Sequence, residues 1–170
     1  MTESHKITEK LIQAYDRMME NLHALYEKAS GESNNIQGML EETRDKIAET
    51  DNLTREEAEK VSNWLKRDLQ NAGEYLKSEQ HELADWLHMD IELIEWSLMD
   101  MFLTVADPTK VALMKFEADV KANSEYHTGE ITGAGTLTCV ECGEVLHFKK
   151  SGHIPPCPKC NHTVYTRKSR

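Results

Sequence analysis

The chain has 170 residues, 29% of them charged, and a formal net charge of −10 at pH 7. Residues before Cys139 contain 14 Lys and Arg against 28 Asp and Glu, whereas the segment from Cys139 onward contains 6 against 2, so an acidic body precedes a basic end. An acidic body repels phosphate backbones and anionic membranes, so any contact with nucleic acid is expected only from the C-terminal end.

No apolar run in the sequence approaches the roughly 20 residues that a bilayer-spanning helix needs. The N-terminal stretch MTESHKITEKLIQ also lacks the basic and then apolar order of a secretory signal. We therefore expect a cytoplasmic protein without a membrane partner. In that reducing setting, four clustered cysteines are expected to be metal ligands rather than disulfides.

Three helices are predicted in the first half of the chain. Apolar residues from Ile7 to Leu25 recur every three or four positions and predict a helix over about residues 3–29. A weaker stripe predicts a second helix from Ile36 to about Thr50. The pair Thr54 and Glu57 has the form of a capping box, which predicts that a third helix begins there.

The segment from Glu82 to Val105 is apolar on more than one face and includes Trp86 and Trp96. Such a segment is expected to be either the central helix of a bundle or a contact between two copies, so a homodimer is possible. Asp107 followed by Pro108 predicts the start of a last helix.

The stretch SEYHTGEITGAG, residues 124–135, contains three glycines and no helical stripe. It is predicted to be a linker between a helical domain over residues 1–123 and a zinc ribbon over residues 136–170. The predicted fold is mainly α, an N-terminal antiparallel helical hairpin or bundle with a small C-terminal all-β zinc ribbon.

All four cysteines occur as two C-x-x-C pairs, Cys139 with Cys142 and Cys157 with Cys160. Two such turns can supply a tetrahedron of thiolates, which predicts one structural Zn²⁺ per chain with these four residues as its ligands. An iron site of the same geometry and a redox dithiol are the alternatives.

The residues around these pairs fit short turns and strands. Gly143 and Asn161 follow the two pairs and tolerate the left-handed backbone that such turns require. Short strands are predicted over residues 136–138, 145–148 and 163–166.

Histidines and carboxylates outside the cysteine pairs have weaker patterns. His81, Asp85, His88 and Glu92 would share one helix face, for which a solvated surface is the favoured interpretation over a second metal site. A further three histidines could replace a thiolate, but ordinary surface positions are favoured for them: His147, His153 and His162. No residue is predicted to be catalytic, and the protein is predicted not to be an enzyme.

Six cations surround the predicted ribbon: Lys149, Lys150, Lys159, Arg167, Lys168 and Arg170. A solvated surface is the favoured interpretation. Nucleic-acid binding through Lys149, Lys150, Arg167 and Lys168 is the alternative, and it predicts a steep dependence on salt.

Three portions of the sequence carry a family resemblance: LTREEAEKVSNWLKRDL at residues 53–69, ELADW at 82–86, and YHTGEITGAGTLTCVECGEVLHF followed by PPCPKC. On these the chain resembles the YbeL-like family of small bacterial zinc-ribbon proteins. The resemblance implies a helical N-terminal region, a ribbon whose four cysteines bind zinc, and cytoplasmic residence, and it implies no activity. The predicted function is a non-enzymatic protein that contacts a protein partner, with a nucleic-acid- or ribosome-associated factor as the alternative.

Overall fold

The computed structural model describes residues 2–28, 36–77 and 125–167, and the side chains of 73–77 are not described. The predictions made for Trp86 and Trp96, for the helix after Asp107 and for the face with His81 and His88 lie outside the described residues.

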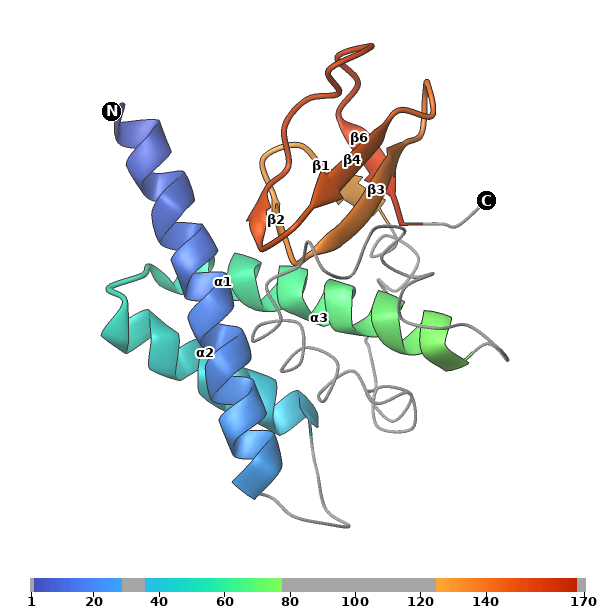
Figure 1. Ribbon diagram of the computed structural model, residues 1–170. Helices are drawn as coiled ribbons and strands as arrows, with labels where there is room; N and C mark the ends of the chain where they lie inside the picture. The colour runs from blue at the N-terminus through green and yellow to red at the C-terminus, as the bar shows by residue number, and fades with distance from the viewer. Residues whose placement is uncertain (1, 29–35, 78–124, 168–170) are drawn as a thin grey trace.

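The first part of the chain forms three helices, α1 (Glu3–Lys28), α2 (Ile36–Thr50) and α3 (Arg55–Lys77). All three pack against one another, and Figure 1 shows α1 crossing α3. Their shared core is built from the predicted apolar stripes: Ala14, Met18, Leu22, Leu40, Ile47, Ala58, Val61, Leu65, Leu69 and Ala72. Ile7, predicted as the first residue of the α1 seam, is instead 47% exposed.

The predicted capping box at the start of α3 is present. The backbone amide of Glu57 donates to Thr54 Oγ1 at 3.1 Å, and the amide of Thr54 donates to Glu57 Oε2 at 2.8 Å. The second of these bonds is the main reason that the pKa of Glu57 is lowered. Each residue thus satisfies an amide that the helix leaves unpaired.

The C-terminal part forms two small sheets. A four-stranded sheet has the order β1-β6-β3-β4 and a two-stranded sheet pairs β2 with β5, all antiparallel. The strands are β1 (Glu125–His127), β2 (Ile131–Thr132), β3 (Gly135–Cys139), β4 (Val145–Phe148), β5 (Gly152–His153) and β6 (Val164–Thr166). The three predicted strands correspond to β3, β4 and β6. Two further strands, β1 and β2, lie within residues 124–135, for which we had predicted a linker.

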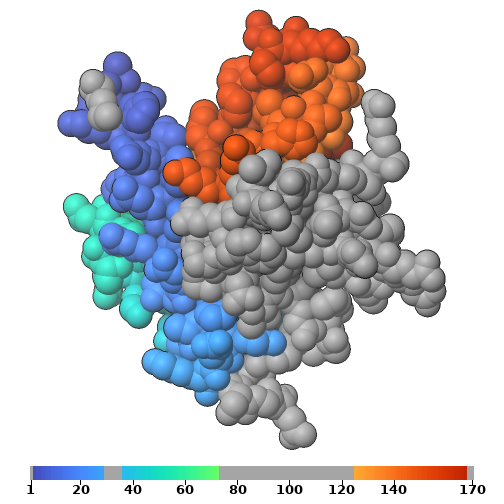
Figure 2. All heavy atoms as spheres, in the orientation of Figure 1, coloured from blue at the N-terminus to red at the C-terminus, as the bar shows by residue number. Residues whose placement is uncertain are grey.

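The β-ribbon packs directly on the helices. Strand β2 contacts both α1 and α3, and β5 contacts α1. Ile131 of β2 is fully buried within the helical core. Figure 2 shows this end of the ribbon against α1, while the opposite end projects from the molecule. The predicted class, helices followed by a small β-ribbon, is therefore confirmed. Within the described residues, no helix is long and apolar enough to cross a membrane.

Candidate metal centre and its support

The two C-x-x-C pairs form matching tight turns. In the first turn the amide of Gly143 donates to the carbonyl of Cys139 at 3.0 Å, and in the second the amide of Asn161 donates to the carbonyl of Cys157 at 2.8 Å. Gly143 has φ 73° and Asn161 has φ 59°. Both residues predicted to adopt the left-handed backbone therefore do so, which lets each turn fold its amides back toward sulfur.

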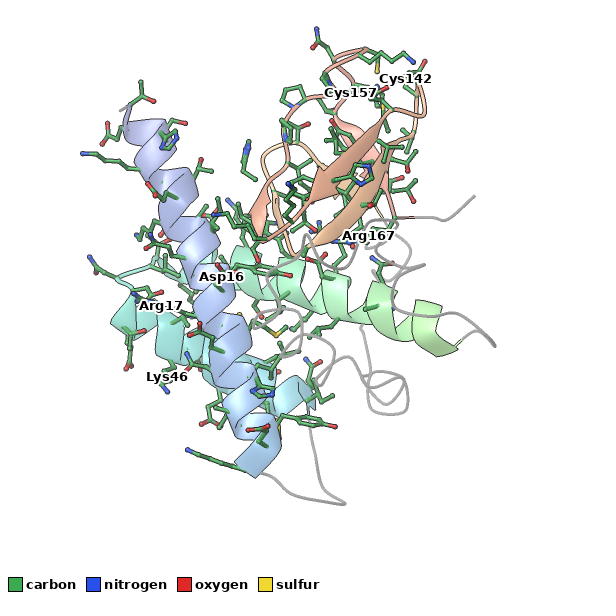
Figure 3. All side chains as sticks on the ribbon, in the orientation of Figure 1. Asp16, Arg17, Lys46, Cys142, Cys157 and Arg167 are labelled. Carbon is green, nitrogen blue, oxygen red and sulfur yellow. The ribbon has the colours of Figure 1, made fainter. Side chains whose placement is uncertain are left out.

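The four cysteines are brought together at the end of the ribbon that points away from the helices, where Figure 3 labels Cys142 and Cys157. All four Sγ atoms lie within 4.8 Å of one another, and two of the separations, Cys139 to Cys160 and Cys142 to Cys157, are 3.6 Å. A tetrahedron with metal–sulfur bonds of about 2.3 Å has edges of about 3.8 Å. The four sulfurs are therefore already spaced for one tetrahedral ion.

Backbone amides favour thiolate at part of this cluster. Burial raises the pKa of Cys157, but hydrogen bonds from the amides of Cys160 and Lys159, together with those from the thiols of Cys142 and Cys160, outweigh it and lower that pKa to about 7. The amide of His162 acts in the same direction on Cys160, yet burial and the neighbouring sulfurs raise its pKa to about 12. Four close sulfurs cannot all carry a charge unaided, so the cluster requires a cation to become a full set of thiolates.

The donor set fits a closed site. Four thiolates complete the tetrahedral coordination of Zn²⁺ and leave no position for water, which is the arrangement of structural sites. Ferrous or ferric iron accepts the same set, so the donors do not separate the two metals. His147, His153 and His162 are not part of the metal-binding group formed by the described residues. His147 instead makes a 3.0 Å hydrogen bond with Thr136 across the β3–β4 pair.

The apolar interior of the ribbon is very small. Its buried residues are Tyr126, Leu137, Cys139, Ile154, Cys157 and Tyr165. Two of these six are members of the cysteine cluster, so a bound ion would sit at one end of the core itself. A core this small cannot hold a ribbon together alone, and metal binding would then contribute directly to its folding.

The basic surface differs from the prediction at Arg167. Its side chain is only 7% exposed, because it enters the interface between ribbon and helices, so it is not available to phosphates. Lys149 and Lys150 are exposed, and Lys159 lies 3.9 Å from Glu144. Lys168 and Arg170 lie outside the described residues. Among described residues, the predicted cationic surface is thus reduced to three lysines.

A second cluster, which the sequence analysis missed, joins the ribbon to the helices. We call it the helix–ribbon network: Tyr15, Arg67, Asp68, Tyr126, Glu130, Thr132 and Arg167. Asp68 Oδ2 accepts hydrogen bonds from Tyr15 at 2.6 Å, from the amide of Gly133 at 2.8 Å and from Thr132 at 3.3 Å. Asp68 is fully buried. These hydrogen bonds connect it both to α1 and to the β2 segment.

One arginine of the network lies in α3 and the other directly follows β6, and the two meet around Tyr126. Arg67 forms an ion pair with Glu130 and donates to the carbonyl of Ile131 at 3.0 Å. Arg167 donates to Thr132 Oγ1 at 2.6 Å and to the hydroxyl of Tyr126 at 3.0 Å. Figure 3 places Arg167 at the α3 end of the ribbon, opposite Cys142 and Cys157.

The network explains why glycine occupies positions 133 and 135. Gly133 approaches Tyr15 so closely that a Cβ would lie 3.0 Å from its hydroxyl, and at Gly135 a Cβ would overlap the guanidinium of Arg167. The signal available in the sequence was the combination of glycines and hydrogen-bonding side chains in YHTGEITGAG, together with adjacent Arg67 and Asp68. We had interpreted this stretch as a linker, whereas two of its glycines permit close packing.

Fold and site together define a zinc-ribbon protein with a helical N-terminal region. The chain matches the family model described as a zinc-ribbon containing domain over residues 5–169, and it belongs to that family. It is 26% identical over 159 residues to a protein described as uncharacterized protein YbeL in Escherichia coli (strain K12), covering 94% of this chain and 96% of that one. The YbeL proteins of two further Escherichia coli strains match with the same values. No solved structure matches the chain.

Proposed function

We propose that this protein is a non-enzymatic, cytoplasmic interaction protein in which one structural Zn²⁺, held by Cys139, Cys142, Cys157 and Cys160, stiffens a recognition head on a helical scaffold. The observation that supports this most directly is the set of four sulfur atoms within 4.8 Å of one another. Four thiolates leave no open coordination position, so the ion would stabilise the ribbon and would not activate water.

The surface beside the cysteine turns favours a protein partner over nucleic acid. Val140 lies inside the first C-x-x-C turn and is 51% exposed, and Val145 at the start of β4 is 41% exposed. Pro155 and Pro156 precede the second turn, Pro158 lies inside it, and all three are exposed as well. Apolar side chains held on rigid turns bury surface against a protein with little loss of conformational entropy. The three exposed lysines of the described part of the ribbon would give only weak, salt-sensitive binding to phosphates.

Metal analysis of the purified full chain tests the first part of the proposal. We expect one zinc per chain, and we expect Cys139→Ser to reduce that content while Ser151→Ala leaves it unchanged. Substitution with Co²⁺ should give the absorption of a tetrahedral thiolate site. A chain that arrives with iron, or with no metal while the ribbon stays folded, would contradict the proposed zinc site.

Affinity capture from the native cytoplasm tests the second part, with a matched pair of surface variants. Val140→Ser changes the ribbon turn, and Ile7→Ser changes an equally exposed apolar residue on α1. If the ribbon is the recognition head, only Val140→Ser should lose partners, and nuclease treatment should have no effect. Loss of partners after nuclease treatment, or after Lys149→Gln with Lys150→Gln, would instead support the nucleic-acid alternative.

A further inference from the structure

The interface between the ribbon and the helices is built mainly from buried polar and charged groups. Arg67 is 4% exposed, Asp68 is 0% exposed and Arg167 is 7% exposed. The principal apolar contact is Ile131, which enters the helical core, with Ala134 packed beside it. An interface of this kind depends strongly on geometry, because a charge that stays buried without its partner is costly. When the two surfaces separate completely, the same charge is hydrated by water and that cost disappears.

The two helical charges of the network, Arg67 and Asp68, each have partners in the ribbon. Arg67 contacts the side chain of Glu130 and the carbonyl of Ile131, and Asp68 is held by Thr132 and the amide of Gly133. On the helical side, Asp68 is also bound by Tyr15 and by the neighbouring Arg67, whose Nε lies 3.4 Å from Asp68 Oδ1. The docked position of the ribbon therefore decides whether this charged face of α1 and α3 is covered or meets solvent.

A short path of neighbouring residues links the network to the cysteine cluster. Tyr126 of the network pairs with Tyr165 across β1 and β6, and Tyr165 pairs with Cys139 across β6 and β3. The hydroxyl of Tyr165 also donates to the carbonyl of Pro155, two residues before Cys157, at 2.9 Å. Tyr126 and Tyr165 are both fully buried in the same small core as the two buried cysteines. Loss of order at the cysteine turns must therefore disturb Tyr126.

We propose that metal binding at the four cysteines controls the docking of the ribbon onto α1 and α3, so that the ion acts as a latch for the charged helical face. This inference rests on the proposed metal site. With the ion bound, the ribbon core holds Tyr126, Glu130 and Thr132 in register with Arg67 and Asp68. Without it, the ribbon loosens, the network separates, and Tyr15, Arg67 and Asp68 are exposed together.

Hydrogen exchange followed by mass spectrometry on the full chain tests the latch. Residues 64–72 of α3 include Arg67 and Asp68 of the network and belong to the helical part of the chain, whereas the cysteines lie at the opposite end of the ribbon. Residues 36–50 of α2 serve as an internal reference. Removing zinc with a chelator should speed exchange in residues 64–72 by about 5- to 150-fold, the range typical of coupling between two sites. The reference should change much less. Equal exchange with and without zinc in residues 64–72 would overturn the latch.

Two variants and a matched control separate coupling from metal binding. Arg67→Gln removes the central charge of the network, and Lys60→Gln removes an exposed charge from the same helix. We expect both to keep one zinc per chain, while only Arg67→Gln loses the effect of zinc on residues 64–72. Should Arg67→Gln fail to fold, Glu130→Gln removes one partner of Arg67 at a position that is 25% exposed and should weaken the effect.

The outcomes of these experiments distinguish the two proposals. A full effect of zinc in both Arg67→Gln and Glu130→Gln would overturn the latch, and the metal site would stand. A wild-type chain that binds no metal would overturn both.

Discussion

The guanidinium carbon of Arg67 lies 3.9 Å from the centroid of the Tyr126 ring, so a cation on α3 sits over an aromatic face from β1. Both side chains are almost completely buried. A desolvated contact of this kind is worth about 2 kcal/mol or more. The Tyr126 hydroxyl also accepts hydrogen bonds from Asn71 at 2.9 Å and Arg167 at 3.0 Å. Tyr126 thus connects β1 both to α3, through Arg67 and Asn71, and to Arg167, the residue that follows β6.

The two roles of Tyr126, its ring and its hydroxyl, can be separated by substitution. Tyr126→Phe keeps the aromatic face for Arg67 but removes the acceptor of the buried Arg167 and of the half-buried Asn71, which should lower the free energy of unfolding by roughly 1–3 kcal/mol. Tyr126→Leu also removes the face and should cost more than Tyr126→Phe. Urea unfolding followed by circular dichroism measures both. As a control, Tyr165→Phe removes one bond to a backbone carbonyl and should cost about 1 kcal/mol.

Stability should fall at alkaline pH because two tyrosines are buried in the network. Burial, followed by the charge of Asp68, raises the pKa of Tyr126 to about 12, and the same two causes raise the pKa of Tyr15 well above its ordinary value. In the unfolded chain both titrate near 10, so above that pH the unfolded state loses protons that the folded state keeps. The contribution of these two tyrosines to the free energy of unfolding is complete below about pH 10 and is lost as the pH rises toward about 12.

Denaturant unfolding of the zinc-loaded protein at a series of alkaline pH values measures this dependence. For Tyr126 alone, a shift from 10 to about 12 corresponds to roughly 2–3 kcal/mol. Tyr126→Phe should therefore be less sensitive to alkaline pH than the wild type, even though it is less stable at neutral pH. An unchanged slope in both Tyr126→Phe and Tyr15→Phe would show that these tyrosines are not the groups responsible.

The glycines of residues 126–135 offer a matched pair of substitutions. Gly129 has φ 97° with nothing within 4 Å of an added Cβ, whereas Gly135 has φ 140° and faces the guanidinium of Arg167. Gly129→Ala should therefore lower the free energy of unfolding only through backbone strain, by roughly 1–3 kcal/mol. Gly135→Ala should lose about 1–3 kcal/mol more, because Arg167 must move. Urea unfolding measures both, and equal losses would contradict the close contact between Gly135 and Arg167.

The features that could be predicted from the sequence are local ones. The Thr54 and Glu57 pair acts through backbone atoms three residues away, and Gly143 and Asn161 act within the same turn as their cysteines. The spacing of the two cysteine pairs likewise predicts a metal site, because each C-x-x-C turn places its two thiols close together without any distant contact. Such signals do not depend on knowing which distant segments meet.

The features that could not be predicted depend on distant contacts. In the sequence, Arg167 stands among other cations near the end of the chain, and only its position beside β1 and β2 shows that it is buried. Strands β2 and β5 contain two residues each, too few for a periodic pattern. The network joins segments more than fifty residues apart, so its members look like ordinary polar residues until the ribbon is docked.

Replacing a threonine by alanine should change the free energy of unfolding in opposite directions at the capping box of α3 and inside α1. Thr54→Ala removes the acceptor for the Glu57 amide and should lower the free energy of unfolding by about 1 kcal/mol, while Thr54→Ser should preserve it. Thr8, inside α1, bonds to the carbonyl of Ser4 on an exposed face. Thr8→Ala should be neutral or stabilising by up to about 0.7 kcal/mol, because alanine is the better helix former. Thermal unfolding compares the three, and equal effects of both alanines would exclude the cap.

The burial of each cysteine should decide which of them tolerates replacement by histidine. Cys160 is exposed, so an imidazole there has room to point at the metal, and a Cys₃His set still suits Zn²⁺. Cys157 is fully buried in the ribbon core, where the larger ring must displace Tyr165 or Ile154. We expect Cys160→His to keep one zinc per chain and Cys157→His to lose it, as measured by metal content after competition with a chromogenic chelator.

Cys160→Ala is the control for that pair of histidine variants, because it removes the ligand without adding bulk and should bind zinc more weakly than Cys160→His. Equal retention of zinc by the Cys157→His and Cys160→His chains would mean that the second turn is looser than its hydrogen bonds imply. It would also remove the reason to expect that order at the cysteines is transmitted through Tyr165 to the helices.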